Sequence, residues 1–274
     1  MSIKNYALAV IKTINEIQED LEVEYREVTK NNNTIQHGIM IKELDSNAAP
    51  TIYVNEYYDK NICVKDAAEN ILELYMKSKV NRVDVDFFKD YQSVRPLLRA
   101  KLVSAQNEQY AGKIASDYGY DDLKIVPYVM VNINGMEGNI TVRDEHLALW
   151  NISIDEVVDQ ALENIKDDYI IQTMDEVMNE MMGIPVMPGS PMSYMYVVTN
   201  KRKIYGAIAA ITAREEIKNK LGENYVVLPS SIHEVICLKN DNNLDELTDM
   251  VRSVNASVVD PADQLSDKAY VIAA

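Results

Sequence analysis

The sequence is short of the residues on which several common kinds of site depend. Its 274 residues include three histidines, two cysteines and nine glycines. Cys63 and Cys237 are too few for a disulfide framework and too far apart in the chain for a zinc ribbon. No histidine belongs to a His-Glu-x-x-His metal motif, and the glycine-rich turns that hold phosphate groups are missing. We therefore expect neither a metal nor another cofactor.

Basic residues and long apolar runs are also scarce. Lysine and arginine total 27 against 43 aspartates and glutamates, which gives a formal net charge of −16. This balance argues against nucleic-acid binding, which needs clustered basic side chains. No stretch approaches the roughly 18 apolar residues of a membrane span, and the first residues lack the pattern of a signal peptide. The expectation is a cytoplasmic protein that binds neither membranes nor nucleic acids.

Apolar spacing and turn residues predict an α+β fold of mixed α/β character. Residues 3–20 carry apolar side chains at helical spacing, and segments 22–28 and 34–41 predict a hairpin. Polar caps followed three residues later by glutamate begin other helices, as at Asp66 with Glu69, Ser153 with Glu156 and Thr173 with Glu176. Strands interleave with these helices, so we expect helices packed on an antiparallel-rich sheet. The same signals predict helices at 66–79, 107–116, 144–150, 173–181, 212–221 and 243–254. They predict strands at 51–54, 94–103 (an edge strand broken at Pro96), 123–133 (interrupted at 127), 139–142, 169–171, 194–198, 204–211, 225–228, 232–238 and 269–273.

The charged segment 81–90 suggests a boundary between two parts of the chain. We expect a smaller N-terminal α/β subdomain, residues 1–85, built as helix, hairpin and helix. Residues 86–274 would then form a C-terminal α+β domain. A chain of this length is also compatible with one domain.

The stretch that organises the second half is residues 224–239. Its two strands flank a corner, Pro229-Ser230-Ser231, that carries His233. On an extended chain Ser231 and His233 lie on one face, about 7 Å apart. They could therefore form a hydrolytic site with Glu234 or a distant aspartate, although the glycines of a nucleophile elbow are missing. The alternative is a structural corner in which the serine hydroxyls satisfy turn amides.

Methionine is concentrated before this corner. Seven of the thirteen methionines lie between Met174 and Met195. At helical spacing, Met174, Met178 and Met181 are expected in the core, whereas the methionines of the proline-rich loop suit a surface that binds partners of varied shape. Together with the corner and a hairpin tip expected at residues 199–202, they give a candidate binding surface: Ser230, Ser231, His233, Thr199, Asn200, Met187 and Met192.

Three motifs of the C-terminal half carry a family resemblance. They are LPSSIHEV at 228–235, YVVTN at 196–200 and LSDKAY at 265–270. With them the chain resembles an uncharacterised bacterial family of unknown function over about residues 95–273. The resemblance implies no activity.

Taken together, these observations favour a non-catalytic bacterial protein that binds a protein or peptide partner. A Ser/His-type hydrolase centred on Ser231 and His233 is the alternative, and self-association through a sheet edge or the methionine-rich segment is a third interpretation.

Overall fold

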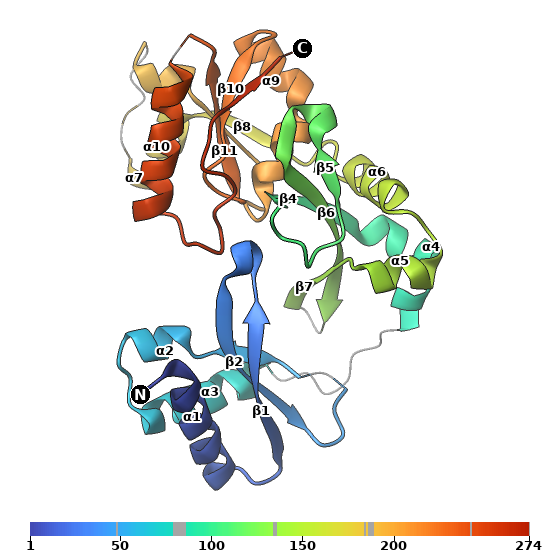
Figure 1. Cartoon of the computed structure of the whole chain (residues 1–274), viewed down its shortest axis with the longest axis vertical. Helices are drawn as coiled ribbons and strands as arrows, with labels where there is room; N and C mark the ends of the chain where they lie inside the picture. The colour runs from blue at the N-terminus through green and yellow to red at the C-terminus, as the bar shows by residue number, and fades with distance from the viewer. Residues whose placement is uncertain are drawn as a thin grey trace. The chain divides into compact units, whose positions relative to one another are not determined.

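The computed structural model describes residues 1–47, 49–78, 86–133, 136–183, 185, 189–241 and 243–273. Contacts along the chain divide it into two units (Figure 1). The first unit is Met1–Asp86 with Asn132–Glu137, and the second is Phe87–Val131 with Gly138–Ala274. Residues 81–85 of the expected boundary segment lie outside the described residues. The expected subdomains, 1–85 and 86–274, stay a prediction about independent folding.

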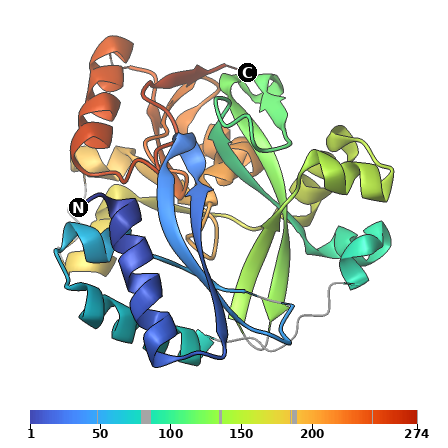
Figure 2. The same cartoon turned by 60° about the horizontal axis from the view of Figure 1, so that its bottom comes forward.

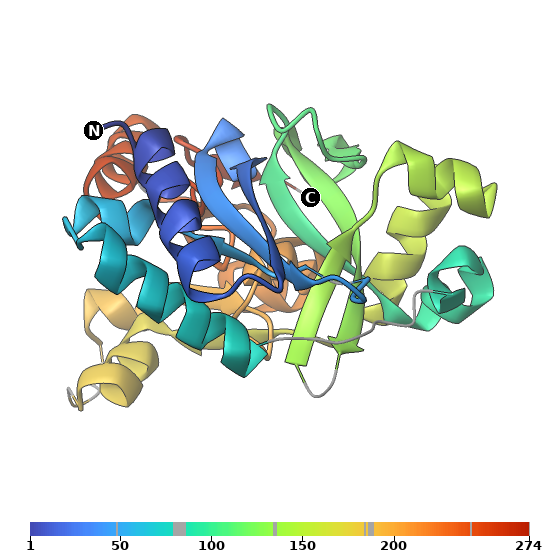
Figure 3. The ribbon, with the colours of Figure 1, turned by 90° about the horizontal axis from the view of Figure 1, so that it is seen from below.

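The first unit packs helices against a three-stranded antiparallel sheet of order β1-β2-β3. Its elements are α1 (Ile3–Ile17), β1 (Leu21–Thr29), β2 (Ile35–Glu43), β3 (Thr51–Tyr53), α2 (Asn55–Asp59) and α3 (Val64–Ser78). Figure 3 shows α1 and α3 side by side, and their apolar faces share a core with Ile39 and Ile41 of β2. The helix–hairpin–helix prediction is confirmed. The expected cap at Asp66 is wrong, because α3 begins at Val64 and Asp66 lies in its first turn.

One sheet of the second unit is built around a long central strand. Its strands are β4 (Leu98–Ser104), β5 (Lys113–Ala115), β6 (Tyr120–Ile133) and β7 (Met136–Thr141). The order is β4-β6-β5, and β7 also pairs with β6. The green strand β6 can be followed along its whole length in Figure 2. The predicted interruption at Pro127 is wrong, because β6 continues through it and pairs Pro127 with Ala100.

The other sheet of the second unit has five antiparallel strands in the order β12-β10-β11-β9-β8. They are β8 (Ile170–Thr173), β9 (Tyr196–Thr199), β10 (Tyr225–Leu228), β11 (Glu234–Lys239) and β12 (Tyr270–Ile272). Side chains alternate between its faces. Val226 and Leu228 pack with Leu247 and Val251 of α10 (Leu244–Ser257), the red helix of Figures 1 and 2. Tyr225 and the other alternate residues face the main core of the unit.

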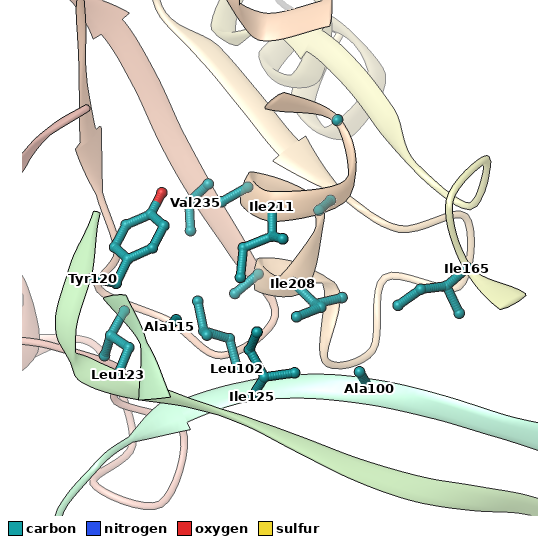
Figure 4. Close-up of a cluster of buried hydrophobic side chains, with 14 of the residues drawn as sticks. Ala100, Leu102, Ala115, Tyr120, Leu123, Ile125, Ile165, Ile208, Ile211 and Val235 are labelled. Carbon is teal, nitrogen blue, oxygen red and sulfur yellow. The ribbon is translucent and has the colours of Figure 1, made fainter. Parts of the chain in front are cut away.

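That core draws on both sheets of the second unit. Leu102 and Ile125 come from the first sheet and Val235 from the second, with Ile208 and Ile211 from the segment after β9 (Figure 4). All five are buried. Burial of this apolar surface is the main favourable contribution to folding of the unit.

Side chains that cap the first turn mark the N-terminal ends of several helices of the second unit. Ser153 and Glu156 form a capping box at α6 (Ile154–Asn164), and Thr173 and Glu176 form one at α7 (Met174–Met182), as predicted. The Asn243 side chain caps α10 by accepting a hydrogen bond from the N–H of Asp245 at 3.1 Å. The other helices of the unit are α4 (Tyr91–Val94), α5 (Asp144–Trp150), α8 (Ala209–Thr212) and α9 (Arg214–Leu221).

The edge strand expected at 94–103 is confirmed apart from its start. It corresponds to β4, at one end of the strand order, which begins only at Leu98 because Pro96 lies in a 3-10 turn, Arg95–Leu97. The helix expected at 107–116 is absent from this described segment, and Lys113–Ala115 forms β5 instead. Gly112 explains the difference: a Cβ there would stand 2.5 Å from the carbonyl oxygen of Ile125, so the segment lies flat against β6.

The strand expected at 204–211 is also wrong. Residues 206–208 form a 3-10 turn and α8 follows directly. The run contains Ala207, Ala209 and Ala210, and alanine has the highest helix propensity of all residues. Residues 199–202 are consequently not the tip of a hairpin. They begin a loop that leaves β9 and returns to contact β11 through the 3-10 turn.

Candidate functional site

The corner between β10 and β11 is held by backbone hydrogen bonds. The amides of Leu265 and Ser266 donate to the carbonyl oxygens of Ser230 (3.2 Å) and Pro229 (3.0 Å). Ser231 is buried, and its hydroxyl oxygen accepts a hydrogen bond from the backbone N–H of His233 at 3.0 Å. This contact satisfies a turn amide, which is the structural role foreseen for the serines.

Both ring nitrogens of His233 are engaged. Nδ1 accepts a hydrogen bond from the backbone N–H of Tyr205 at 3.2 Å, and Nε2 lies 3.5 Å from Oδ1 of Asp263. A ring nitrogen that accepts from an amide carries no proton, so the proton of a neutral ring is on Nε2 and faces the carboxylate. His233 therefore has no free lone pair with which to remove a proton from a serine.

Thr199 and Asn200 join the same cluster from the end of β9. The Thr199 hydroxyl donates to the carbonyl oxygen of His233 at 2.7 Å. The Asn200 amide donates to the carbonyl of Ile204 at 2.8 Å and accepts from its N–H at 3.2 Å, which closes the loop 200–204. Both side chains are buried. The structure thus brings Thr199, Asn200, Ser231 and His233 together, although the first two are not available at the surface.

Tyr205 lies at the centre of this region, although no sequence motif points to it. Its backbone is left-handed, with φ of 55°, which is strained for a bulky residue. Its ring stacks on His233 (centroids 5.9 Å apart, 13° between planes) and meets Tyr128 edge-on at 5.7 Å. The Lys101 ammonium lies 4.9 Å from its centroid. We name Lys101, Tyr128, Tyr205 and His233 the Tyr205 cluster.

Basic side chains surround the Tyr205 cluster in an otherwise acidic chain. Arg202 is exposed, and its Nη1 lies 2.9 Å from Sδ of Met130. Burial raises the pKa of Tyr128 to about 12, while the charges of Arg202 and Arg99 act in the opposite direction. These residues come from β4, β6 and the loop after β9, and no local sequence pattern connects them.

Met192 of the predicted binding surface lies away from Thr199, Asn200, Ser231 and His233. Met192 precedes Tyr196, the first residue of β9, whereas Thr199 is its last, so the two lie at opposite ends of the strand. Met187 lies outside the described residues. Met181 was expected in the core, and that expectation is wrong because it is 73% exposed. The predicted binding surface is therefore divided into two separate regions.

A family model described as a family of unknown function, DUF5688, matches residues 3–272. The chain belongs to this family. The match extends the resemblance seen in the C-terminal motifs over the N-terminal unit as well. No curated protein and no solved structure matches the chain.

Other regions of this DUF5688 chain offer weaker sites. Open hollows of about 420 and 290 Å³ flank α6, and acidic side chains of that helix, Asp159 and Glu163, line both. Within the described ranges, no group of three or more histidine, cysteine, aspartate or glutamate side chains could hold a metal ion. Among the helices that the structure describes, none combines the length and apolar character that a membrane crossing requires.

His146 of the DUF5688 chain is expected to make the folding stability depend on pH. Its Nδ1 accepts from the Arg143 N–H at 3.2 Å, and its ring packs on Phe88 and Trp150. Burial lowers its pKa below the ordinary value of 6.5, against a smaller opposing effect of Glu145. The unfolded chain therefore takes up this proton at higher pH than the folded chain. The stability contributed by neutral His146 is present above pH 6.5 and is lost as the pH falls through 6.5 towards the folded-state pKa.

His146→Gln tests this dependence, because glutamine keeps an acceptor at this position and does not titrate. We expect the unfolding midpoint of the wild type to fall by about 1–2 °C more than that of the variant between pH values of about 7.5 and 5.5. Fluorescence of Trp150, the only tryptophan of the chain, follows the transition. Equal pH dependence of the two proteins would contradict the assignment.

Proposed function

We propose that this DUF5688 protein is a non-catalytic protein of the bacterial cytoplasm that binds a protein or peptide partner. In this proposal Tyr205 and Arg202 form the contact surface, and the buried Lys101 and Tyr128 hold Tyr205 in place. The observation that carries the proposal is the strained, half-buried Tyr205, held by the hydrogen bond from its N–H to His233 and by packing against Tyr128 and Lys101. Strained residues persist where the surrounding structure holds them for a function.

The residue types support recognition of a protein. Tyrosine and arginine are enriched among the residues that contribute most to binding energy at protein interfaces. Lys201, Arg202 and Lys203 are exposed beside Tyr205. In a chain of net charge −16, this basic segment complements a partner that carries carboxylates. The expected partner is therefore a protein or peptide with an acidic segment.

The geometry gives less support to the Ser/His-type hydrolase. The Ser231 hydroxyl accepts from a backbone amide, and both nitrogens of His233 have partners. Glu234 begins β11 and pairs with Thr199 in the strand register. A nucleophilic serine needs a base that can accept its proton, and His233 has no lone pair to offer in this arrangement.

A tagged pull-down from native lysate tests the proposal with two site variants and a matched control. Tyr205→Ala and Arg202→Glu should reduce recovery of a specific partner at least about tenfold, the effect of losing one strong interface contact. Tyr194→Ala removes a tyrosine that is 59% exposed at the opposite end of β9, and it should leave recovery unchanged. Binding should weaken with added salt, because charge complementarity is screened.

Two results would contradict the proposal. One is equal recovery of the partner by all three variants after circular dichroism has shown that they are folded. The other is covalent labelling of Ser230 or Ser231 by a fluorophosphonate probe, lost in His233→Ala, which would favour the hydrolase. If the partner proves to be a second copy of the chain and only Tyr194→Ala releases it, self-association through the exposed Met181, Met182 and Met192 is the better interpretation.

A further inference from the structure

The hydrogen bond between Tyr205 and His233 depends on the protonation state of the imidazole. Nδ1 of His233 accepts from the Tyr205 N–H at 3.2 Å, and it can do so only while it carries no proton. A second proton on the ring turns Nδ1 into a donor that faces another donor. Imidazole is the side chain that ordinarily gains such a proton between about pH 8 and about pH 5. The bond that holds the strained Tyr205 is therefore sensitive to pH.

The surroundings of His233 give a charged ring a partner. Nε2 lies 3.5 Å from Oδ1 of Asp263, whose carboxylate stabilises a positive imidazole, and the His233 side chain is 30% exposed. The Lys101 ammonium, 4.9 Å from the centroid of the Tyr205 ring, opposes protonation from the far side of that ring. The other titratable groups on the segments that meet around the imidazole are Tyr128, Lys201, Arg202, Lys203, Glu234 and Asp260. Because Asp263 faces the ring directly, protonation does not leave an unpaired charge.

The residue that yields on protonation is Tyr205. The backbone of His233 is held at both ends, because its N–H donates to a serine hydroxyl and its carbonyl oxygen accepts from a threonine hydroxyl. Tyr205 has a φ of 55°, and its N–H relies on the imidazole. Hydrogen bonds at Ile204 and Ala207, on either side, do not involve the ring. Loss of the bond therefore frees the backbone at Tyr205 and leaves the rest of the loop in place.

We propose that protonation of His233 releases Tyr205 and weakens binding of the partner, so that the contact surface responds to pH. The effect on binding rests on the proposed function. Its sign follows from linkage: the ordered Tyr205 needs an unprotonated ring, so this conformation binds fewer protons than the released one, and falling pH favours release. A partner that selects the ordered Tyr205 therefore binds more tightly at about pH 7.5 than at about pH 5.5.

Nuclear magnetic resonance of the full chain tests the coupling without any partner. The imidazole nitrogens report the protonation of His233, and the amide signal of Tyr205 reports its hydrogen bond. In the wild type we expect both to change over the same pH range. His233→Asn places a carbonyl oxygen near the position of Nδ1 and does not titrate, so its Tyr205 amide should keep the high-pH signal. His146→Gln removes another histidine of the second unit and should leave the wild-type change intact.

A Tyr205 amide signal that stays constant while His233 becomes protonated would overturn the inference. The wild-type titration alone gives this answer, so the test does not depend on the folding of a variant.

The pull-down repeated at about pH 7.5 and about pH 5.5 tests the effect on binding. Recovery of the partner by the wild type should fall about fivefold at the lower pH, the effect of losing one hydrogen bond. Recovery by His233→Asn, shown to be folded by circular dichroism, should stay the same. An equal fall in both proteins would mean that pH acts on another group, and would overturn the inference.

Failure of the proposed function gives a different result. Equal recovery by the wild type, Tyr205→Ala and Arg202→Glu at about pH 7.5 would refute the contact surface and, with it, the effect of pH on binding. The amide titration would still decide whether His233 controls Tyr205.

Discussion

Replacing Gly206 by alanine is expected to lower the free energy of unfolding by about 3 kcal/mol, because overpacking a tight contact costs this much. A Cβ at this position would collide with the Thr199 hydroxyl and the carbonyl oxygen of His233, and would stand 2.7 Å from the backbone nitrogen of Asn200. These atoms are backbone or hydrogen-bonded to backbone, so they cannot move aside cheaply. The unfolding midpoint should fall by about 6–12 °C.

Gly138→Ala is the matched control. Its Cβ would lie 3.4 Å from Cγ2 of Val131, which is ordinary van der Waals contact, and the variant should stay within about 1 kcal/mol of the wild type. Because Gly206 follows Tyr205, Gly206→Ala should also displace the Tyr205 cluster and reduce partner recovery. If Gly206→Ala is as stable as Gly138→Ala, Gly206 is not packed tightly against Thr199, His233 and Asn200, and this prediction is wrong.

Interactions that span a few residues could be predicted from the sequence. The capping boxes of α6 and α7 depend on side chains three residues apart, and both occur where the pattern placed them. The hairpin of β1 and β2 follows from alternating apolar residues around an asparagine turn. In these cases the deciding contact lies within the predicted element itself.

Elements decided by distant contacts could not be predicted in this way. Segment 204–211 has the apolar content of a strand, but Gly206 is pressed against Thr199 and His233, and the alanines that follow form a helix. The same limit applies to the candidate site. His233 is identifiable as a rare residue, whereas Tyr205 and Asp263, which contact its ring, lie 28 and 30 positions away. Their meeting depends on the sheet order, which local patterns do not encode.

Truncating Ile125 to alanine is expected to lower the free energy of unfolding of the second unit by about 4 kcal/mol. Ile125 is fully buried in β6, where it pairs with Leu102 and Lys113 on neighbouring strands. Removing its side chain leaves a cavity in the core that joins the two sheets. Ile114→Ala is the control on the adjacent strand, because Ile114 is 39% exposed and its truncation should cost less than about 1 kcal/mol. Trp150 belongs to the same core, so its fluorescence should report the full loss in Ile125→Ala.

The same reporter tests whether the two units unfold separately, as the predicted boundary near residue 86 implies. Ile71 is fully buried in the core of the first unit, and Ile71→Ala should cost a similar amount there. If the units are independent, circular dichroism should show a destabilised transition in Ile71→Ala while the Trp150 fluorescence transition stays at its wild-type midpoint. A shift of both signals together would mean that the chain unfolds as one cooperative unit, because both probes would then report the same all-or-none transition.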